Sequence, residues 1–133
     1  MSTCILVADD DRGIVKAIRT RLQRKGYTVY GVTTGREAIS AFESIRPDVV
    51  LLDASMPDVS GLDVCRHIRA IDSDFRTRVY IVSGASAPSE EYVGRCVDAC
   101  DVDGYLRKPL DWDKLTALLE CLNAQEPHAE ALA

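Results

Sequence analysis

The chain has 133 residues and a formal net charge of −5 at pH 7, and 47% of its residues are hydrophobic while 28% are charged. These values are typical of a single soluble globular domain that is large enough to form a hydrophobic core. They argue against nucleic-acid binding, because an acidic domain is poorly suited to neutralising phosphates, and no apolar run is long enough to cross a bilayer. The N-terminus also lacks the basic start and apolar core of a signal peptide.

Five short apolar or β-branched runs predict β-strands at residues 4–8, 27–33, 49–52, 79–82 and 104–107. After each run, apolar residues recur at helical spacing, over residues 14–22, 38–45, 64–71, 92–100 and 115–122. Gly26 is the predicted end of the first helix, Thr34 and Glu37 form a predicted capping box, and Asp111 is the N-cap expected for the last helix. Strict alternation of strands and helices predicts an α/β fold with a parallel sheet and helices on both faces.

The five cysteines are odd in number and include no Cys-x-x-Cys pair. Cys96 and Cys100 are four residues apart, a spacing that zinc could use, but no histidine cluster accompanies them. They are therefore interpreted as small buried residues. This use of cysteine indicates a reduced, cytoplasmic protein.

Polar residues follow four of the predicted strands at their carboxyl ends: Asp9, Asp10, Asp11, Asp53, Ser83 and Lys108. Because the carboxyl ends of parallel strands lie at one edge of a sheet, we expect these side chains to converge. Clustered carboxylates repel one another unless a cation is present, and magnesium prefers oxygen ligands. A lysine and a hydroxyl suit phosphoryl oxygens, and the central carboxylate of Asp53 could accept a phosphoryl group as an acyl phosphate.

Each of these residues also has a purely structural interpretation. An acidic residue after a strand can cap the next helix, and Asp11 is the best candidate for such a cap. Asp53 and Ser83 could be turn residues, and Lys108 a solvated charge. The occurrence of such residues at the ends of four strands nevertheless favours a functional site.

Four motifs, in this order, are found at the predicted strand ends: Ile-Leu-Val-Ala-Asp-Asp, Val-Val-Leu-Leu-Asp-x-x-Met-Pro-x-x-x-Gly, Val-Ser-Gly and Tyr-Leu-Arg-Lys-Pro. With them the chain resembles, from about Ile5 to Leu122, the receiver domain of bacterial two-component response regulators. The resemblance implies a flavodoxin-like (βα)5 fold with strand order 2-1-3-4-5. It also implies a receiver domain over residues 1–124, followed by a flexible C-terminal tail or the start of a linker over residues 125–133.

The resemblance also implies the chemistry. Asp53 would accept a phosphoryl group from a sensor histidine kinase or a histidine phosphotransfer protein in a reaction that depends on Mg²⁺, with Mn²⁺ as an alternative. Asp10 would bind the metal directly, Asp9 would bind it through water, and Asp53 and the backbone carbonyl of Ser55 would be further ligands. Lys108 would contact both the phosphoryl group and Asp53.

A switch is implied as well. Ser83 would move toward the new phosphate, Tyr105 would turn inward behind it, and the surface formed by the fourth helix, fifth strand and fifth helix would change. The Lys108–Pro109 peptide would be cis. The domain would be a cytoplasmic signalling module rather than an enzyme, catalysing only its own phosphorylation and dephosphorylation, without a nucleic-acid or membrane partner. The output partner and a phosphorylation-dependent dimer stay open.

The segment between Ser83 and Lys108 departs from the family pattern. It is a few residues longer, and it lacks the usual Gly-Ala before the fifth strand, reading Asp-Ala-Cys-Asp-Val-Asp at residues 98–103. The region of the fourth helix is therefore expected to have an unusual shape. Ser55 and Ala85 have small side chains, which leaves access for a water that attacks the phosphoryl group.

Two other functions compete with a phosphorylated receiver. A receiver-like interaction module that is not phosphorylated is disfavoured by the complete set of acids, hydroxyl and lysine. A magnesium-dependent aspartyl-phosphate phosphatase of the haloacid dehalogenase type would have a second acid two residues after its nucleophile, where this chain has Ser55. A P-loop enzyme is excluded because the chain has no Gly-rich loop followed by Lys-Ser or Lys-Thr.

Overall fold

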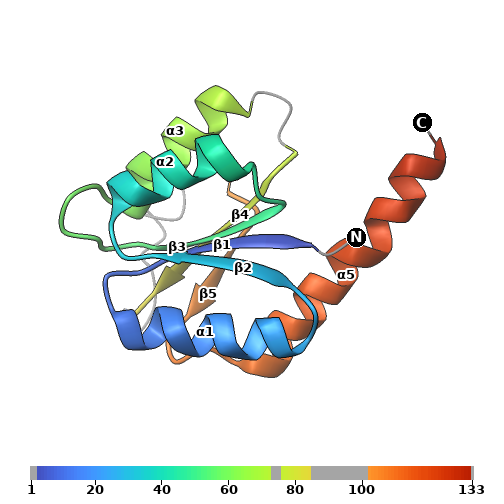
Figure 1. Ribbon diagram of the computed structural model, residues 1–133, viewed down its shortest axis with the longest axis horizontal. Coiled ribbons are helices and arrows are strands. Elements are labelled where there is room, and N and C mark those ends of the chain that lie inside the picture. Colours follow the sequence, from blue (N-terminus) through green and yellow to red (C-terminus); the bar gives the residue numbers. More distant parts are fainter. Residues whose placement is uncertain (1–2, 73–75, 85–101, 133) are drawn as a thin grey trace.

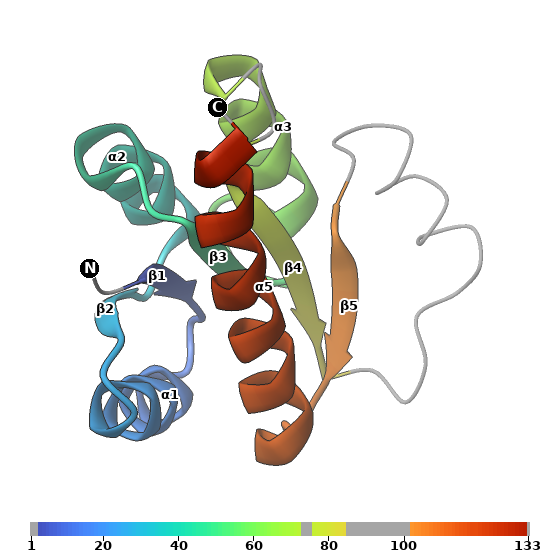
Figure 2. The same cartoon turned by 90° about the vertical axis from the view of Figure 1, so that its right-hand side faces the viewer.

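The computed structural model describes residues 3–72, 76–84 and 102–132, with side chains up to residue 122 in the last range. Five parallel strands form one sheet in the order β2-β1-β3-β4-β5. The strands are β1 (Cys4–Ala8), β2 (Thr28–Val32), β3 (Val49–Asp53), β4 (Arg78–Ser83) and β5 (Gly104–Arg107). The predicted flavodoxin-like strand order is confirmed, and β5 lies at the edge of the sheet beyond β4 (Figure 2).

Four helices are described, and they cover both faces of the sheet. They are α1 (Arg12–Arg24), α2 (Gly35–Ile45), α3 (Gly61–Ile71) and α5 (Trp112–Leu132). Helices α2 and α3 lie on one face, and α1 and α5 lie on the other (Figure 1). The fourth helix predicted from residues 92–100 lies outside the described residues.

The central strands are buried because both faces of the sheet are covered. All five residues of β3 are buried, and Ile5, Leu6, Val7 and Ala8 of β1 are at most 1% exposed. Alternate residues of a strand point to opposite faces, so β1 and β3 contribute to two separate cores. This explains why these strands read as continuous apolar runs in the sequence.

Capping interactions begin the helices where the sequence predicted them. The carboxylate of Asp11 accepts hydrogen bonds from two N–H groups in the first turn of α1. Thr34 accepts from the Glu37 N–H at 3.1 Å, and the Thr34 hydroxyl donates to the Glu37 carboxylate at 3.0 Å. Asp111 accepts from two N–H groups of α5 at 3.1 Å each. Gly26, with a φ of 97°, ends α1 in a conformation that favours glycine.

The last helix extends further than the apolar pattern of the sequence. The backbone of α5 is helical up to Leu132, whereas a flexible tail was predicted from Gln125. This segment contains two alanines and two glutamates, which favour helix, whereas the prediction rested on the general tendency of chain ends to be poorly ordered. The domain boundary at residue 124 stays a prediction.

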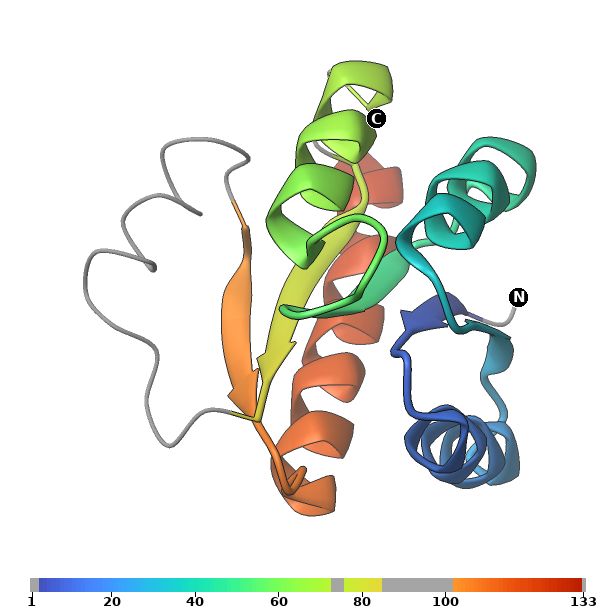
Figure 3. The same ribbon diagram turned by 90° about the vertical axis from the view of Figure 1, so that its left-hand side faces the viewer.

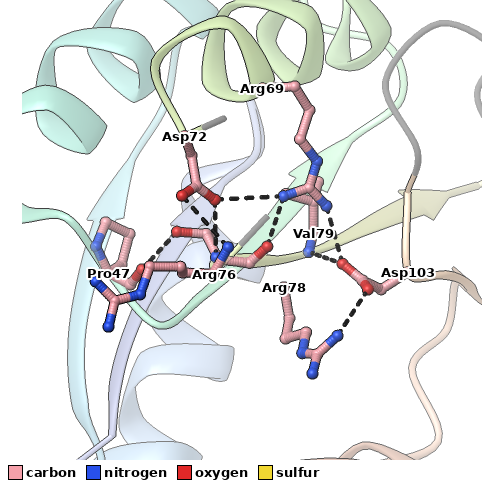
Figure 4. A network of polar contacts seen from close by, with 8 residues as sticks. Pro47, Arg69, Asp72, Arg76, Arg78, Val79 and Asp103 are labelled. Atoms are coloured by element: carbon pink, nitrogen blue, oxygen red, sulfur yellow. Dashed lines mark hydrogen bonds and ion pairs between the residues drawn. The ribbon is translucent and has the colours of Figure 1, made fainter. Parts of the chain in front are cut away.

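A network of charged side chains lies at the amino edge of the sheet, where β4 and β5 begin (Figure 4). Arg69 of α3 donates to the Thr77 carbonyl at 2.7 Å and to Asp103 at 3.0 Å, and it lies 3.5 Å from Asp72. The Asp103 carboxylate in turn accepts from the Val79 N–H at 2.7 Å. We call Arg69, Asp72 and Asp103 the amino-edge network, and it ties the end of α3 to the first residues of both strands.

Candidate functional site

Three aspartates converge at the opposite, carboxyl edge of the sheet. Asp9 follows β1 directly and Asp53 ends β3, and the pairing of Ala8 with Leu52 places them side by side on adjacent strands. Asp10 is the next residue after Asp9, and one carboxylate oxygen from each of the three lies within 4.8 Å of the others. Asp9 is 2% exposed and Asp53 is 5% exposed, while Asp10 is exposed. The predicted convergence of these three carboxylates is therefore present.

Lys108 contributes a positive charge to this cluster. Its Nζ atom lies 2.7 Å from Asp9 Oδ2 and 3.5 Å from Asp53 Oδ1. Its backbone N–H donates to the Ser83 carbonyl at 2.9 Å, which joins the ends of β5 and β4. Burial lowers the pKa of Lys108, but the hydrogen bond to Asp9 and the charge of Asp53 raise it overall, so the side chain stays an ammonium. The Lys108–Pro109 peptide is cis, as predicted.

Burial and the neighbouring charges of the cluster change the pKa of Asp53. Burial raises the pKa of this carboxyl, the hydrogen bond from the Ser55 N–H at 3.2 Å lowers it, the charge of Asp9 raises it, and Lys108 lowers it. The balance raises the pKa of Asp53 from 3.8 to about 6. Three carboxylates facing one ammonium leave an excess of negative charge, which a divalent cation would relieve. The residues present therefore fit a magnesium ion.

The remaining predicted residues lie on β4, on β5 and in the loop after β3. Ser83 ends β4 and is 7% exposed, and its register partner on β5 is Arg107. Tyr105 lies two residues earlier on β5, half-buried, and packs against the core on the α2 and α3 side of the sheet. Ser55 is exposed, and its N–H binds Asp53. Their individual roles in a switch or as a metal ligand stay predictions.

Two residues, one at the start of α3 and one in the loop between β3 and α3, have a role that the sequence did not predict. A Cβ atom at Gly61 would overlap the carbonyl oxygen of Asp53, so this close approach requires glycine. The glycine that ends the central motif thus has a physical reason. Asp58 accepts hydrogen bonds from the first residues of α2, and these N–H groups hold its pKa below the ordinary value. No sequence spacing indicated this contact between a loop and another helix.

An open cavity of about 440 Å³ lies beside the cluster. It is lined by Lys108 and by apolar side chains of α1 and of residues 109–112, among them Trp112. The guanidinium carbon of Arg21 in α1 lies 4.5 Å from the centroid of the Trp112 ring, and this cation–π contact holds the indole of α5 against α1. Because Trp112 and Lys108 line the same cavity, the fluorescence of this tryptophan, the only one in the sequence, is a natural reporter of the cluster.

Comparisons with known proteins identify the family. A model of the response regulator receiver domain matches residues 5–120. The response regulator MprA of Mycolicibacterium vanbaalenii is 38% identical over 122 residues, which cover 92% of this chain and 51% of that protein. The chain spans about half the length of the curated relatives it matches. No helix within the described ranges has the length and apolar character of a membrane span.

Solved structures agree with this match. A CheY-like receiver domain protein from Methanospirillum hungatei has a TM-score of 0.83 and 26% identity, with 96% of this chain and 99% of that chain covered. The BeF3-activated receiver domain of DrrB has a TM-score of 0.77 and 30% identity, with 90% and 96% covered. Fold and strand-end cluster define a receiver domain of the two-component type. The chain belongs to the family of response regulator receiver domains.

Proposed function

We propose that Asp53 accepts a phosphoryl group from the phosphohistidine of a sensor kinase or a phosphotransfer protein. The observation that supports this most directly is the position of Asp53, a buried carboxyl with two further aspartates and the Lys108 ammonium around it. Oδ1 of Asp53 takes the Ser55 N–H and faces Lys108, which leaves Oδ2 to attack phosphorus. The phosphorus–nitrogen bond of the donor then breaks as the acyl phosphate bond forms, and the imidazole leaves as a neutral ring that keeps the proton of its other nitrogen.

A magnesium ion would be held by Asp10, Asp53 and the Ser55 carbonyl, with Asp9 bound through water. When bound, it supplies charge neutralisation to the carboxylates and to the phosphoryl oxygens. Lys108 neutralises a further oxygen, and its short contact with Asp9 holds it at the edge of the cluster before the phosphoryl group arrives. The chain would catalyse its own phosphorylation and dephosphorylation by positioning these charges.

The response to phosphorylation would pass through Ser83 and Tyr105. Ser83 ends the strand next to Asp53, and it is joined to Lys108 through its carbonyl. A new phosphoryl group at Asp53 would attract the Ser83 hydroxyl, and Tyr105 would repack behind it. The receiver domain of DrrB, which has a similar fold, has been solved in a BeF3-activated form. The surface around β5 and the start of α5 would then signal to an output partner in the cytoplasm.

Phosphorylation can be tested without the cognate kinase. The purified chain is incubated with acetyl phosphate and Mg²⁺, and its intact mass is measured. We expect the mass to increase by one phosphoryl group in the wild type, and we expect no increase in Asp53→Ala or when magnesium is chelated. An unmodified wild type would favour the interaction module that is not phosphorylated. Phosphorylation that persists in Asp53→Ala would refute the assignment of the acceptor.

A further inference from the structure

The loop between β3 and α3, residues 54–60, is held by contacts at its base, in its middle and at its tip. At its base, the Gly61 N–H donates to the Ala54 carbonyl at 3.2 Å. In its middle, Met56 is 6% exposed and belongs to the core that α2 and α3 cover. At its tip, Asp58 binds the start of α2, and Figure 3 shows the same loop from the side where it joins α3. The loop therefore has three anchors, and the third is on a neighbouring helix.

The anchor at Asp58 uses both carboxylate oxygens. Oδ1 accepts from the Gly35 N–H at 2.9 Å, and Oδ2 accepts from the Arg36 N–H at 3.0 Å. Thr34, the N-cap of α2, accepts from the Glu37 N–H instead. The first three N–H groups of this helix are therefore divided between its own cap and a residue of the loop. A carboxylate is also favoured at this end of a helix by the helix dipole.

Close packing at the same place fixes the distance between the loop and the helix. A Cβ atom at Gly35 would lie 2.7 Å from both the Cβ atom and the carbonyl oxygen of Val59. The backbone of the loop thus rests directly on the first residue of α2. Helix α2 is itself held against the sheet by Ala38 and Phe42, which are fully buried. Figure 1 shows the loop at the left of the view, beside the first turn of α2.

We propose that Asp58 is a positioning residue of the phosphoryl site, which holds the loop on α2 so that Ser55 keeps its place beside Asp53. Ser55 lies three residues before Asp58 in this loop, and its N–H already binds Asp53 Oδ1. The proposal rests on the proposed function, because that function assigns the Ser55 carbonyl to magnesium. Asp58 itself touches neither the metal nor the phosphoryl group, and it acts through the backbone of the loop.

The test compares Asp58→Ala and Asp58→Asn with Asp63→Ala. Asp63 is an exposed aspartate in the first turn of α3 that pairs with Arg66 of the same helix, so its removal takes away the same charge without releasing the loop. Three quantities are measured: hydrogen exchange of residues 54–60, Mg²⁺ affinity from Trp112 fluorescence, and the rate of phosphorylation by acetyl phosphate.

In Asp58→Ala we expect faster exchange in the loop and weaker Mg²⁺ binding. The decrease in affinity is at most roughly fivefold, the value reached if the whole stability cost of losing a capping contact falls on the Mg²⁺-bound state. Phosphorylation should slow in proportion. Asp58→Asn keeps one acceptor oxygen, so it should lie between Asp58→Ala and wild type, and Asp63→Ala should match wild type. Circular dichroism confirms that each variant is folded.

Two results would overturn the proposal. If Asp58→Ala binds Mg²⁺ and is phosphorylated like Asp63→Ala, while exchange rises only in the first turn of α2, then Asp58 is merely a helix cap. If exchange of residues 54–60 is unchanged, the loop does not depend on Asp58 at all. Failure of the proposed function gives a different pattern, because the wild type itself would then neither bind Mg²⁺ nor take a phosphoryl group.

Discussion

Aspartates cluster at both edges of the sheet, but the two clusters differ in how their negative charge is balanced. At the amino edge, the guanidinium of Arg69 faces the carboxylates of Asp72 and Asp103. A second arginine pairs with Asp103, and backbone N–H groups bind both acids. At the carboxyl edge, three aspartates face the ammonium of Lys108, and the pKa of Asp53 is raised to about 6. The first arrangement is satisfied by the protein alone, whereas the second is short of positive charge.

This difference separates a structural network from a functional one. A buried charge is tolerated when partners and hydrogen bonds surround it, and removal of one partner is then costly. A cluster with unbalanced charge is instead held in place by the rest of the fold, and a ligand relieves its repulsion. The comparison predicts that substitutions at the amino edge will change stability, while substitutions at the carboxyl edge will change chemistry and pH dependence.

The largest effect on stability is expected for Arg69→Met. This variant leaves Asp72 and Asp103 without the arginine that lies between them, and the side chains of Arg69 and Asp72 are only 7% and 8% exposed. We expect the free energy of unfolding to fall by about 3 kcal/mol in urea denaturation. Arg66→Met is the control, because Arg66 is 54% exposed, and it should cost less than about 0.5 kcal/mol. Equal losses in the two variants would show that the amino-edge network does not stabilise the fold.

Asp53→Asn should increase the free energy of unfolding at neutral pH, by less than Arg69→Met decreases it. The folded protein binds the proton of Asp53 more tightly than the unfolded chain, because the pKa is raised from 3.8 to about 6. Without metal, the wild type should therefore lose about 2 kcal/mol relative to Asp53→Asn as the pH rises from 4 to 7. Thermal or urea unfolding at several pH values measures this difference, and saturating Mg²⁺ should reduce it. If the free energies of unfolding of the two proteins depend on pH in the same way, the pKa of Asp53 is not raised in the folded state.

The smallest of these effects concerns Lys108→Ala in the protein without metal. Lys108 lowers the pKa of Asp53 through its charge, so its removal should raise that pKa above about 6. NMR titration of the aspartate carboxyl carbons measures the change. Arg107→Ala removes a neighbouring exposed charge and should leave the titration of Asp53 almost unchanged. A downward shift in Lys108→Ala would mean that Lys108 does not face Asp53.

The sequence could predict those parts of the molecule that follow from local pattern and topology. The bounds of β1 and β5 agree with the predicted runs, and the capping roles of Asp11 and Thr34 agree as well. The convergence of Asp9, Asp53 and Lys108 followed from the rule that parallel strands end at one edge.

Contacts between distant segments could not be predicted in this way. Asp58 binds residues 22 and 23 positions earlier in the chain, and Arg69 binds Asp103 across 34 positions. Such pairs depend on how the helices pack against the sheet, and a single sequence has no periodicity that reports it. A lysine suits a neighbouring carboxylate, but the sequence could not indicate that Lys108 pairs most closely with Asp9. Strand order places both residues near Asp53 without fixing which of them pair.

The central claim is that the carboxyl-edge cluster binds a divalent cation and the amino-edge network does not. A titration of the ¹⁵N-labelled protein with Mg²⁺, followed through amide NMR signals, tests this most directly. We predict saturable shifts of the amides of residues 9–11, 53–55 and 108, which are lost in Asp10→Asn, and no shifts of residues 69, 72 and 103. Shifts that persist in Asp10→Asn, or that occur at the amino edge instead, would contradict this account.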